Sequence, residues 1–214
     1  MSHEPPAAPG PPPDAAEDAG LRSRTRRHGG LVAVLGIAGA VALVLGLVAL
    51  IGRATETDAE APKLVLPPAA AGLVRMDETV DMAQVRGRLD DRGAAAAYGR
   101  AGAARADVIV VVAADRRSGA AAGKLDRFYA ELRSSEARVD PAQFRRADPG
   151  PGRGVLQCHP VVYPVQNLTL DMCVWADEHT VGSVVALPGA DNVGSIDELA
   201  RLTRDMRVDL AAVR

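Results

Sequence analysis

Apolar residues follow two different patterns in this chain, and the difference divides it into parts. Residues 31–51, LVAVLGIAGAVALVLGLVALI, are continuously apolar and contain neither a charged residue nor a proline. A helix of this length spans roughly 30 Å, the thickness of the hydrocarbon core of a bilayer. After residue 68 the apolar residues form shorter runs and stripes separated by polar turns. The pattern predicts one transmembrane helix over residues 31–51, followed by a folded domain over residues 69–214.

The charges on either side of the apolar run predict its orientation. Arginines precede the run at positions 22, 24, 26 and 27, whereas acidic residues follow it at positions 56, 58 and 60. Because basic flanking segments remain in the cytoplasm, we expect a single-pass protein of the cell membrane with an extracytoplasmic C-terminal domain. The run is too long for a cleaved secretory signal, and Pro62 would hinder cleavage after the A-x-A sequence at 59–61. We therefore interpret it as a retained signal-anchor.

Small residues recur every four positions within the apolar run, at Ala38, Ala42 and Gly46. This spacing allows two membrane helices to approach closely, so it is compatible with a homodimer in the bilayer. The whole chain is rich in alanine and glycine, however, and small residues then fall at this spacing by chance. We favour the chance explanation over the homodimer.

Residues 1–28 have the composition of a disordered, Pro-rich cytoplasmic tail. The segment MSHEPPAAPGPPPDAAEDAG at 1–20 contains no aromatic or branched apolar residue from which a core could form. Such a tail can dock into an aromatic groove of a partner protein, but we favour a solvated extension. On the other side of the apolar run, residues 52–68 end in two prolines and are interpreted as a linker.

Strand patterns outnumber helix patterns in the C-terminal domain. The clearest strand is Asp107–Ala113, DVIVVVA, whose continuous β-branched run predicts a central position in a sheet. Weaker strand patterns cover residues 72–76 and 94–101. Three further segments predict consecutive antiparallel strands: 155–162, 168–175 and 181–187.

Three segments of the same domain have helical patterns. Residues 77–91 and 120–136 each place apolar side chains on one face. A third helix follows Ser195, because Ser195 and Glu198 have the spacing of a capping box, in which the two side chains bond to backbone donors reciprocally. The resulting fold class is α+β, with a mainly antiparallel sheet packed against about three helices.

Composition restricts the classes of partner that we expect. All of the 25 basic residues except Lys63 and Lys124 are arginines, so a local cluster of arginines carries little information here. The formal net charge is −2 and aromatic residues make up 3% of the chain. These values give no reason to expect nucleic-acid binding, and we expect no cofactor.

The two cysteines of the chain, Cys158 and Cys173, both lie in the domain that we expect outside the cytoplasm. Oxidising surroundings make a disulfide their expected state. A hairpin that turns near residue 165 would place them directly opposite one another. A zinc site that combines them with His159 and His179 does not have the spacing of known zinc ligands, and no C-x-x-C redox motif is present.

One segment around the second cysteine resembles a known group of proteins. The sequence CVWAD at 173–177, followed by TVGSVV at 180–185, is similar to the C-terminal signature of uncharacterised actinobacterial single-pass membrane proteins. Those proteins have a Pro-rich cytoplasmic tail, one transmembrane helix and an outer domain with a C…CVWAD…TxGxV segment. The resemblance implies the same layout for this chain, and it carries over no catalytic or ligand-binding residue.

The sequence Asp177-Glu178-His179 is the densest group of chemically active side chains in the domain. An acid, a base or a metal ligand could come from it, but we favour a polar turn between two strands, because aspartate is a common turn residue. A G-x-S-x-G nucleophile motif is absent from the sequence. We therefore predict no catalytic, cofactor-binding or metal-ligating residue, and retain these three as a weak candidate site.

A Pro-, Gly- and Arg-rich stretch over residues 140–154 predicts an irregular segment. Its three alternating glycines do not form a phosphate loop, since no G-K-[ST] follows and Pro151 removes a backbone donor. Its arginines, Arg145, Arg146 and Arg153, could meet an anionic surface. A solvated loop is favoured because arginine is the default cation of this chain.

The sequence leads to two functional hypotheses. The first is a membrane-anchored extracytoplasmic binding or interaction module, non-enzymatic, that contacts a protein or a cell-envelope component. The alternative is an envelope hydrolase that uses Asp177 and His179. We favour the first because the motifs in the sequence account for an anchor and a disulfide-linked domain but not for a reaction.

Overall fold

The computed structural model describes residues 64–80, 82–87, 89, 93–115, 119–134, 137–190 and 193–211. The expected tail over residues 1–28 and the expected transmembrane helix over residues 31–51 lie outside these described residues, as does the stripe of Ala38, Ala42 and Gly46. Among the residues that the structure describes, no helix is long and apolar enough to cross a membrane.

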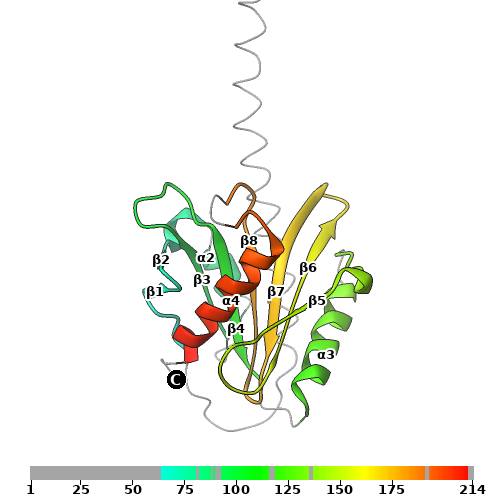
Figure 1. Ribbon diagram of the computed structural model, residues 1–214. Helices are drawn as coiled ribbons and strands as arrows, with labels where there is room; N and C mark the ends of the chain where they lie inside the picture. Colours follow the sequence, from blue (N-terminus) through cyan, green and yellow to red (C-terminus); the bar gives the residue numbers. More distant parts are fainter. Residues whose placement is uncertain are drawn as a thin grey trace, which may run out of the picture. The chain divides into compact units, whose positions relative to one another are not determined.

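One antiparallel sheet organises the described residues (Figure 1). Its strands are β1 (Ala69–Ala70), β2 (Leu73–Arg75), β3 (Gly93–Gly99), β4 (Val108–Ala114), β5 (Arg145–Ala147), β6 (Val155–Tyr163), β7 (Leu168–Ala176) and β8 (Thr180–Ala186). Their order in the sheet is β1-β2-β3-β4-β8-β7-β6-β5, and every neighbouring pair is antiparallel. The prediction of an α+β fold with a mainly antiparallel sheet is confirmed.

Five helical segments accompany the sheet in the described residues. They are the 3-10 helix η1 (Asp77–Thr79), α2 (Met82–Arg86), α3 (Ala121–Ser134), the 3-10 helix η2 (Pro141–Gln143) and α4 (Ile196–Ala211). The two long helices, α3 and α4, confirm the helices expected over residues 120–136 and after Ser195. The irregular stretch expected over residues 140–154 contains η2 and the three-residue strand β5.

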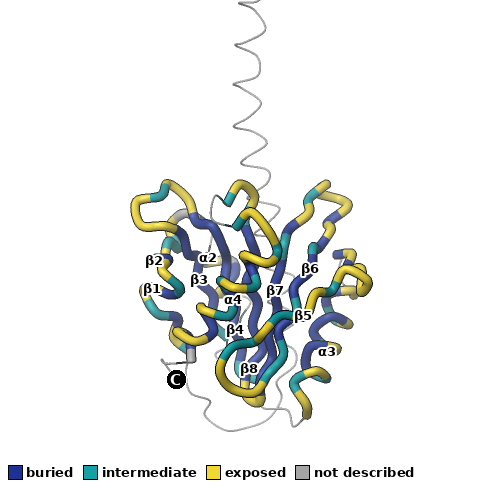
Figure 2. Tube along the Cα trace, in the orientation of Figure 1, coloured by how far each residue is buried: buried dark blue, intermediate teal, exposed yellow. Residues whose placement is uncertain are grey.

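Both faces of the sheet are covered. α4 lies over β6, β7 and β8 on one face, where it buries Leu199 and Met206. α3 and the short α2 cover the other face, where α3 buries Leu125, Phe128 and Leu132. Successive side chains of a strand point to opposite faces, so a strand covered on both sides is apolar throughout. Figure 2 shows this arrangement as buried strands with exposed connections.

The strand β4 illustrates this rule and confirms its expected central position. It lies between β3 and β8. Val110 belongs to the apolar cluster under α4, whereas Ile109 and Val111 belong to the cluster under α3. All three are 0% exposed. The continuous β-branched run in the sequence thus reflects a strand with two buried faces.

The single helix expected over residues 77–91 is only partly present. Val80 separates η1 from α2 with an extended backbone, at φ −136° and ψ 146°. The Asp77 carboxylate accepts hydrogen bonds from the Arg86 guanidinium and from the backbone N–H of Ala97 in β3, the latter at 3.1 Å. These bonds satisfy backbone and side-chain groups at the edge of β3, and such tertiary contacts override helix propensity.

The start of α4 follows the expected capping box with one difference. The Ser195 hydroxyl accepts a hydrogen bond from the backbone N–H of Glu198 at 3.3 Å, as predicted. The Glu198 carboxylate, however, accepts from the N–H of Gly194 at 2.8 Å, one residue before the expected donor. Both bonds satisfy backbone donors near the beginning of the helix, so the signal located the helix correctly.

Residues 64–68, which the sequence assigned to the linker, belong to the folded region. Leu66 is 6% exposed and packs in the apolar cluster under α4. The hydroxyl of Tyr98 in β3 donates a hydrogen bond to the carbonyl of Pro67 at 2.8 Å. Residues 64–68 therefore pack against the described domain ahead of its first strand.

The predicted disulfide between Cys158 and Cys173 is present. The two residues are direct partners in the β6–β7 register, with a Cα–Cα distance of 4.0 Å. They are 1% and 0% exposed and lie in the apolar cluster under α4. Their sequence separation is 15 residues, and closing a loop of that length stabilises a fold by about 3 kcal/mol in the chain-entropy model.

Candidate functional site

The turn between β7 and β8 is built around Asp177, which follows the last residue of β7. One carboxylate oxygen of Asp177 accepts hydrogen bonds from the backbone N–H groups of His179 at 2.9 Å and Thr180 at 2.8 Å. The N–H of Asp177 donates to the carbonyl of Thr180 at 2.9 Å. These bonds give aspartate the local turn-forming role that the sequence favoured.

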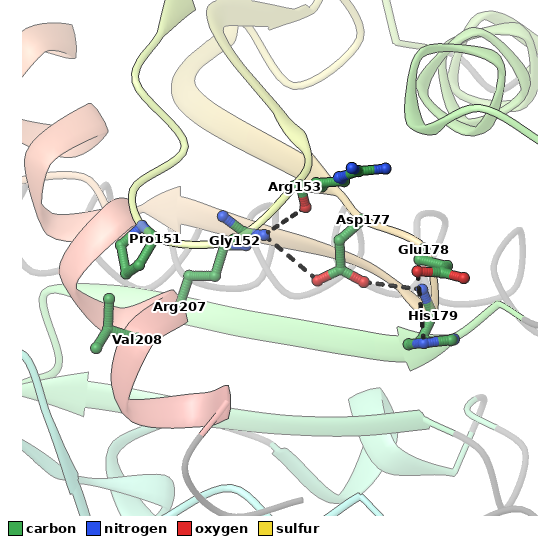
Figure 3. A pocket seen from close by; sticks show the side chains of 8 residues that line it. All are labelled: Pro151, Gly152, Arg153, Asp177, Glu178, His179, Arg207 and Val208. Atoms are coloured by element: carbon green, nitrogen blue, oxygen red, sulfur yellow. Dashed lines mark hydrogen bonds and ion pairs between the residues drawn. The ribbon is translucent and has the colours of Figure 1, made fainter.

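Arg207 of α4 lies beside this turn. It is 6% exposed, and its guanidinium donates hydrogen bonds to the carbonyls of Pro149 and Arg153. Its Nη2 also lies 3.6 Å from the second carboxylate oxygen of Asp177. One buried cation therefore joins α4, the loop over residues 148–154 and the β7–β8 turn (Figure 3).

The 148–154 loop, DPGPGRG, approaches the helix closely because its glycines lack side chains. Gly150 and Gly152 have positive φ angles of 79° and 90°, a conformation that glycine adopts without steric cost. A Cβ atom on Gly154 would lie 2.7 Å from the carbonyl oxygen of Ala176 and 3.0 Å from Nη2 of Arg207. The alternating glycines thus permit close contact with α4 and β7.

Lys124 of α3 holds the same turn from the other face of the sheet. Its side chain is 0% exposed. The ammonium donates hydrogen bonds of 2.7 Å to the carbonyls of Asp115 and Glu178, and it lies 3.9 Å from the Asp115 carboxylate. The β7–β8 turn is therefore fixed by two buried cations that come from helices on opposite faces.

A pocket of about 450 Å³ opens beside Arg207 and the turn. Its lining consists of Pro151, Gly152 and Arg153 from the loop, Asp177, Glu178 and His179 from the turn, and Arg207 and Val208 from α4. In the view of Figure 3, Pro151 and Val208 lie at one end, Glu178 and His179 lie at the other, and the Arg207–Asp177 pair lies between them. The pocket thus has an apolar end and a charged end.

No family model, curated protein or solved structure matches this chain. The resemblance to actinobacterial single-pass membrane proteins therefore stays a prediction, and the site has to be interpreted from its own geometry.

The three residues of the weak candidate site lie together, but their environments differ. Asp177 is 7% exposed and its oxygens contact the backbone of the turn and Arg207. The side chains of Glu178 and His179 are 81% and 72% exposed, and Glu178 Oε2 lies 3.9 Å from His179 Nε2. The Asp177 carboxylate thus bonds to the backbone N–H of His179, whereas the imidazole of His179 lies near the Glu178 carboxylate.

The second histidine of the domain, His159 in β6, lies in the core instead of the pocket. Its ring centroid is 5.1 Å from that of Tyr129 and 4.8 Å from that of Phe144. Burial lowers the pKa of His159 to about 4, so the ring is neutral at neutral pH. Within the described part of the chain, no group of three His, Cys, Asp or Glu side chains is placed to hold a metal ion.

The sequence interpretation missed the two cations that hold the site, Lys124 and Arg207. Each lies on the apolar side of its helix: Lys124 is four residues before the buried Phe128, and Arg207 is three residues before the buried Leu210. A cation on the apolar stripe of an amphipathic helix indicates a buried polar partner. The abundance of arginine in the chain concealed this signal for Arg207.

Proposed function

We propose that this protein is a membrane-anchored binding module, held in the bilayer by residues 31–51, whose extracytoplasmic domain recognises a protein or cell-envelope component through the pocket at the 148–154 loop. The observation that supports this proposal is the double fixation of the β7–β8 turn by Lys124 and Arg207. These contacts hold the backbone of the turn, from which the exposed side chains of Glu178 and His179 project. Groups that are fixed before binding lose less entropy when a ligand arrives.

The alternative is an envelope hydrolase that uses Asp177 and His179. In such an enzyme the carboxylate would orient the imidazole directly. Here the Asp177 carboxylate bonds to backbone N–H groups and pairs with Arg207, which favours a structural role for this residue. The binding module is therefore the better supported of the two functions.

Site-specific photo-crosslinking in intact membranes tests the binding function. A photoreactive residue at position 179 should crosslink to a partner, whereas one at Val165 should not. Val165 is a matched control because it is 76% exposed and lies in the β6–β7 turn, at the opposite end of β7. Equal crosslinking at the two positions, or none at either, would contradict a binding site at this pocket.

Single substitutions of the exposed residues separate the binding module from the hydrolase. If the imidazole of His179 is catalytic, His179→Ala abolishes the cellular phenotype but leaves crosslinking through a photoreactive residue at position 178 intact. If the residue contributes to binding, His179→Ala weakens both together. Asp177→Ala does not discriminate, because it removes the turn contacts as well.

Thiol labelling tests the proposed membrane topology. The two native cysteines are joined to each other, so an engineered cysteine would be the reactive thiol. A membrane-impermeant reagent applied to intact cells should label Thr55→Cys and spare Ser23→Cys. The reverse result would place the C-terminal domain in the cytoplasm and refute the orientation.

A further inference from the structure

We propose that the pocket binds a small zwitterion with an apolar side chain, of the chemical class of a free aliphatic α-amino acid; this inference rests on the binding function proposed above. Such a ligand carries an ammonium group and a carboxylate on one carbon atom. Its side chain would extend away from the charged end of the pocket.

The charges of the pocket lead to this ligand class. Asp177 and Arg207, both less than one-tenth exposed, pair with each other at 3.6 Å and contribute little net charge. Arg153 and Glu178 are exposed, and they bring one positive and one negative charge to the lining. A ligand that carries both signs complements this pair, with its carboxylate at Arg153 and its ammonium at Glu178.

The same balance disfavours a simple anion or a polyanion. Its attraction to Arg153 would be opposed by Glu178, and the charge of Arg207 is already offset by Asp177. Inorganic phosphate and acetate are therefore suitable negative probes, because each carries a negative charge but no ammonium group.

The apolar end of the pocket accounts for the side chain of the ligand. Val208 is 43% exposed although it is a large apolar residue, and Pro151 lines the same end. A volume of about 450 Å³ falls within the range of small-molecule sites. An aliphatic side chain placed there would remove exposed apolar surface from water, which contributes favourably to binding.

Calorimetry on the full-length protein in detergent, with L-leucine as the probe, tests the inference. Leucinamide lacks the carboxylate, N-acetyl-leucine lacks the ammonium, and glycine lacks the side chain. Each analogue should bind the unmodified protein about tenfold more weakly than leucine or worse, since each loses a charge-assisted contact or apolar burial. Because these comparisons need no substitution, they do not depend on how any variant folds.

Two variants assign the contacts. Arg153→Gln should lower the affinity for leucine about tenfold and should not lower the affinity for leucinamide further. Glu178→Gln should also lower the affinity for leucine about tenfold, and it should leave the affinity for N-acetyl-leucine unchanged. The exposed residues Arg146 and Glu78 lie outside the pocket lining, so Arg146→Gln and Glu78→Gln are matched controls that should bind leucine normally.

Several results would overturn the inference. These are an absence of binding at millimolar leucine, equal binding of leucine and its charge-blocked analogues, and displacement of leucine by acetate or phosphate as effectively as by leucine itself. If crosslinking at position 179 still captures a partner in that case, the ligand class is wrong and the binding function stands. If neither leucine binding nor crosslinking is observed, both proposals fail.

Discussion

The two turns that flank β7 are held in different ways, although both connect neighbouring antiparallel strands. The β6–β7 turn, residues 164–167, is exposed throughout, and a backbone hydrogen bond runs from the N–H of Asn167 to the carbonyl of Pro164 at 3.2 Å. The β7–β8 turn has local bonds of this kind as well, but it is also contacted by Lys124 and Arg207 from two helices. The second turn is therefore held by tertiary contacts in addition to its local bonds, so its conformation depends on the two helices.

Removing the Arg207 cation of α4, which contacts the β7–β8 turn, should cause the largest loss of stability. Arg207→Met removes the guanidinium that pairs with the buried Asp177 carboxylate and donates to the carbonyls of Pro149 and Arg153. We expect the free energy of unfolding to fall by about 4 kcal/mol, because breaking a buried pair leaves an uncompensated charge. Urea unfolding followed by the fluorescence of Trp175, the single tryptophan of the chain, measures this change.

Arg204→Met is the control for that substitution, since Arg204 lies on the same helix and pairs with the exposed Asp205. This substitution should lower the free energy of unfolding by less than about 1 kcal/mol. Equal effects of the two substitutions would contradict the stabilising role assigned to the contacts of Arg207.

Removing the Lys124 cation of α3 should lower the free energy of unfolding somewhat less. Lys124→Met removes the donor of two backbone carbonyls, but the Asp115 carboxylate keeps Arg127 at 3.5 Å. We expect a loss of about 3 kcal/mol. Hydrogen exchange at the amides of His179 and Thr180 should accelerate more than exchange at Asn167. Uniform acceleration at both turns would instead indicate a general loss of packing in the core.

Acidification should weaken the whole domain without distinguishing the turns. Burial lowers the folded-state pKa of His159 to about 4 from 6.5, so the unfolded chain binds the proton more readily. The stability contributed by neutral His159 is therefore complete above about pH 6.5 and is lost as the pH falls toward 4, by about 3 kcal/mol in all. A His159→Phe variant should lack this part of the pH dependence in urea unfolding. An identical pH profile in the variant would assign the loss to other groups.

The smallest effect should come from the β6–β7 turn. Val165→Ser changes an exposed side chain and should alter the free energy of unfolding by less than about 0.5 kcal/mol. A larger loss in urea unfolding would mean that this turn, too, depends on contacts beyond its own backbone, and the contrast between the two turns would disappear.

Sequence patterns predicted the sheet better than the site, and particular residues show why. A hairpin turn near residue 165 correctly placed Cys158 opposite Cys173, and Ser195 correctly located the start of α4, because both signals are local. The break in the expected helix over residues 77–91 depends on a contact between Asp77 and Ala97 of β3. A contact of that kind depends on the assembled sheet, which local patterns do not describe.

The site shows the same limitation more clearly. Asp177, Glu178 and His179 were located as a polar turn, which the hydrogen bonds of Asp177 support. The roles of Lys124 and Arg207, however, depend on two helices that meet one turn from opposite faces. Periodicity predicts which side of a helix is apolar, but it does not predict which segment that side will face.

The order of the strands has a consequence for how the domain folds. β6, β7 and β8 are joined by short turns, so their pairing closes only small loops. β4 pairs with β8, with Ala114 opposite Thr180, across a much longer stretch of chain. Because long loops cost more entropy to close, we expect the β6–β8 unit to form early and the β4–β8 pairing to limit the folding rate. The bond between Cys158 and Cys173 would then form within the early unit, before the N-terminal strands join the sheet.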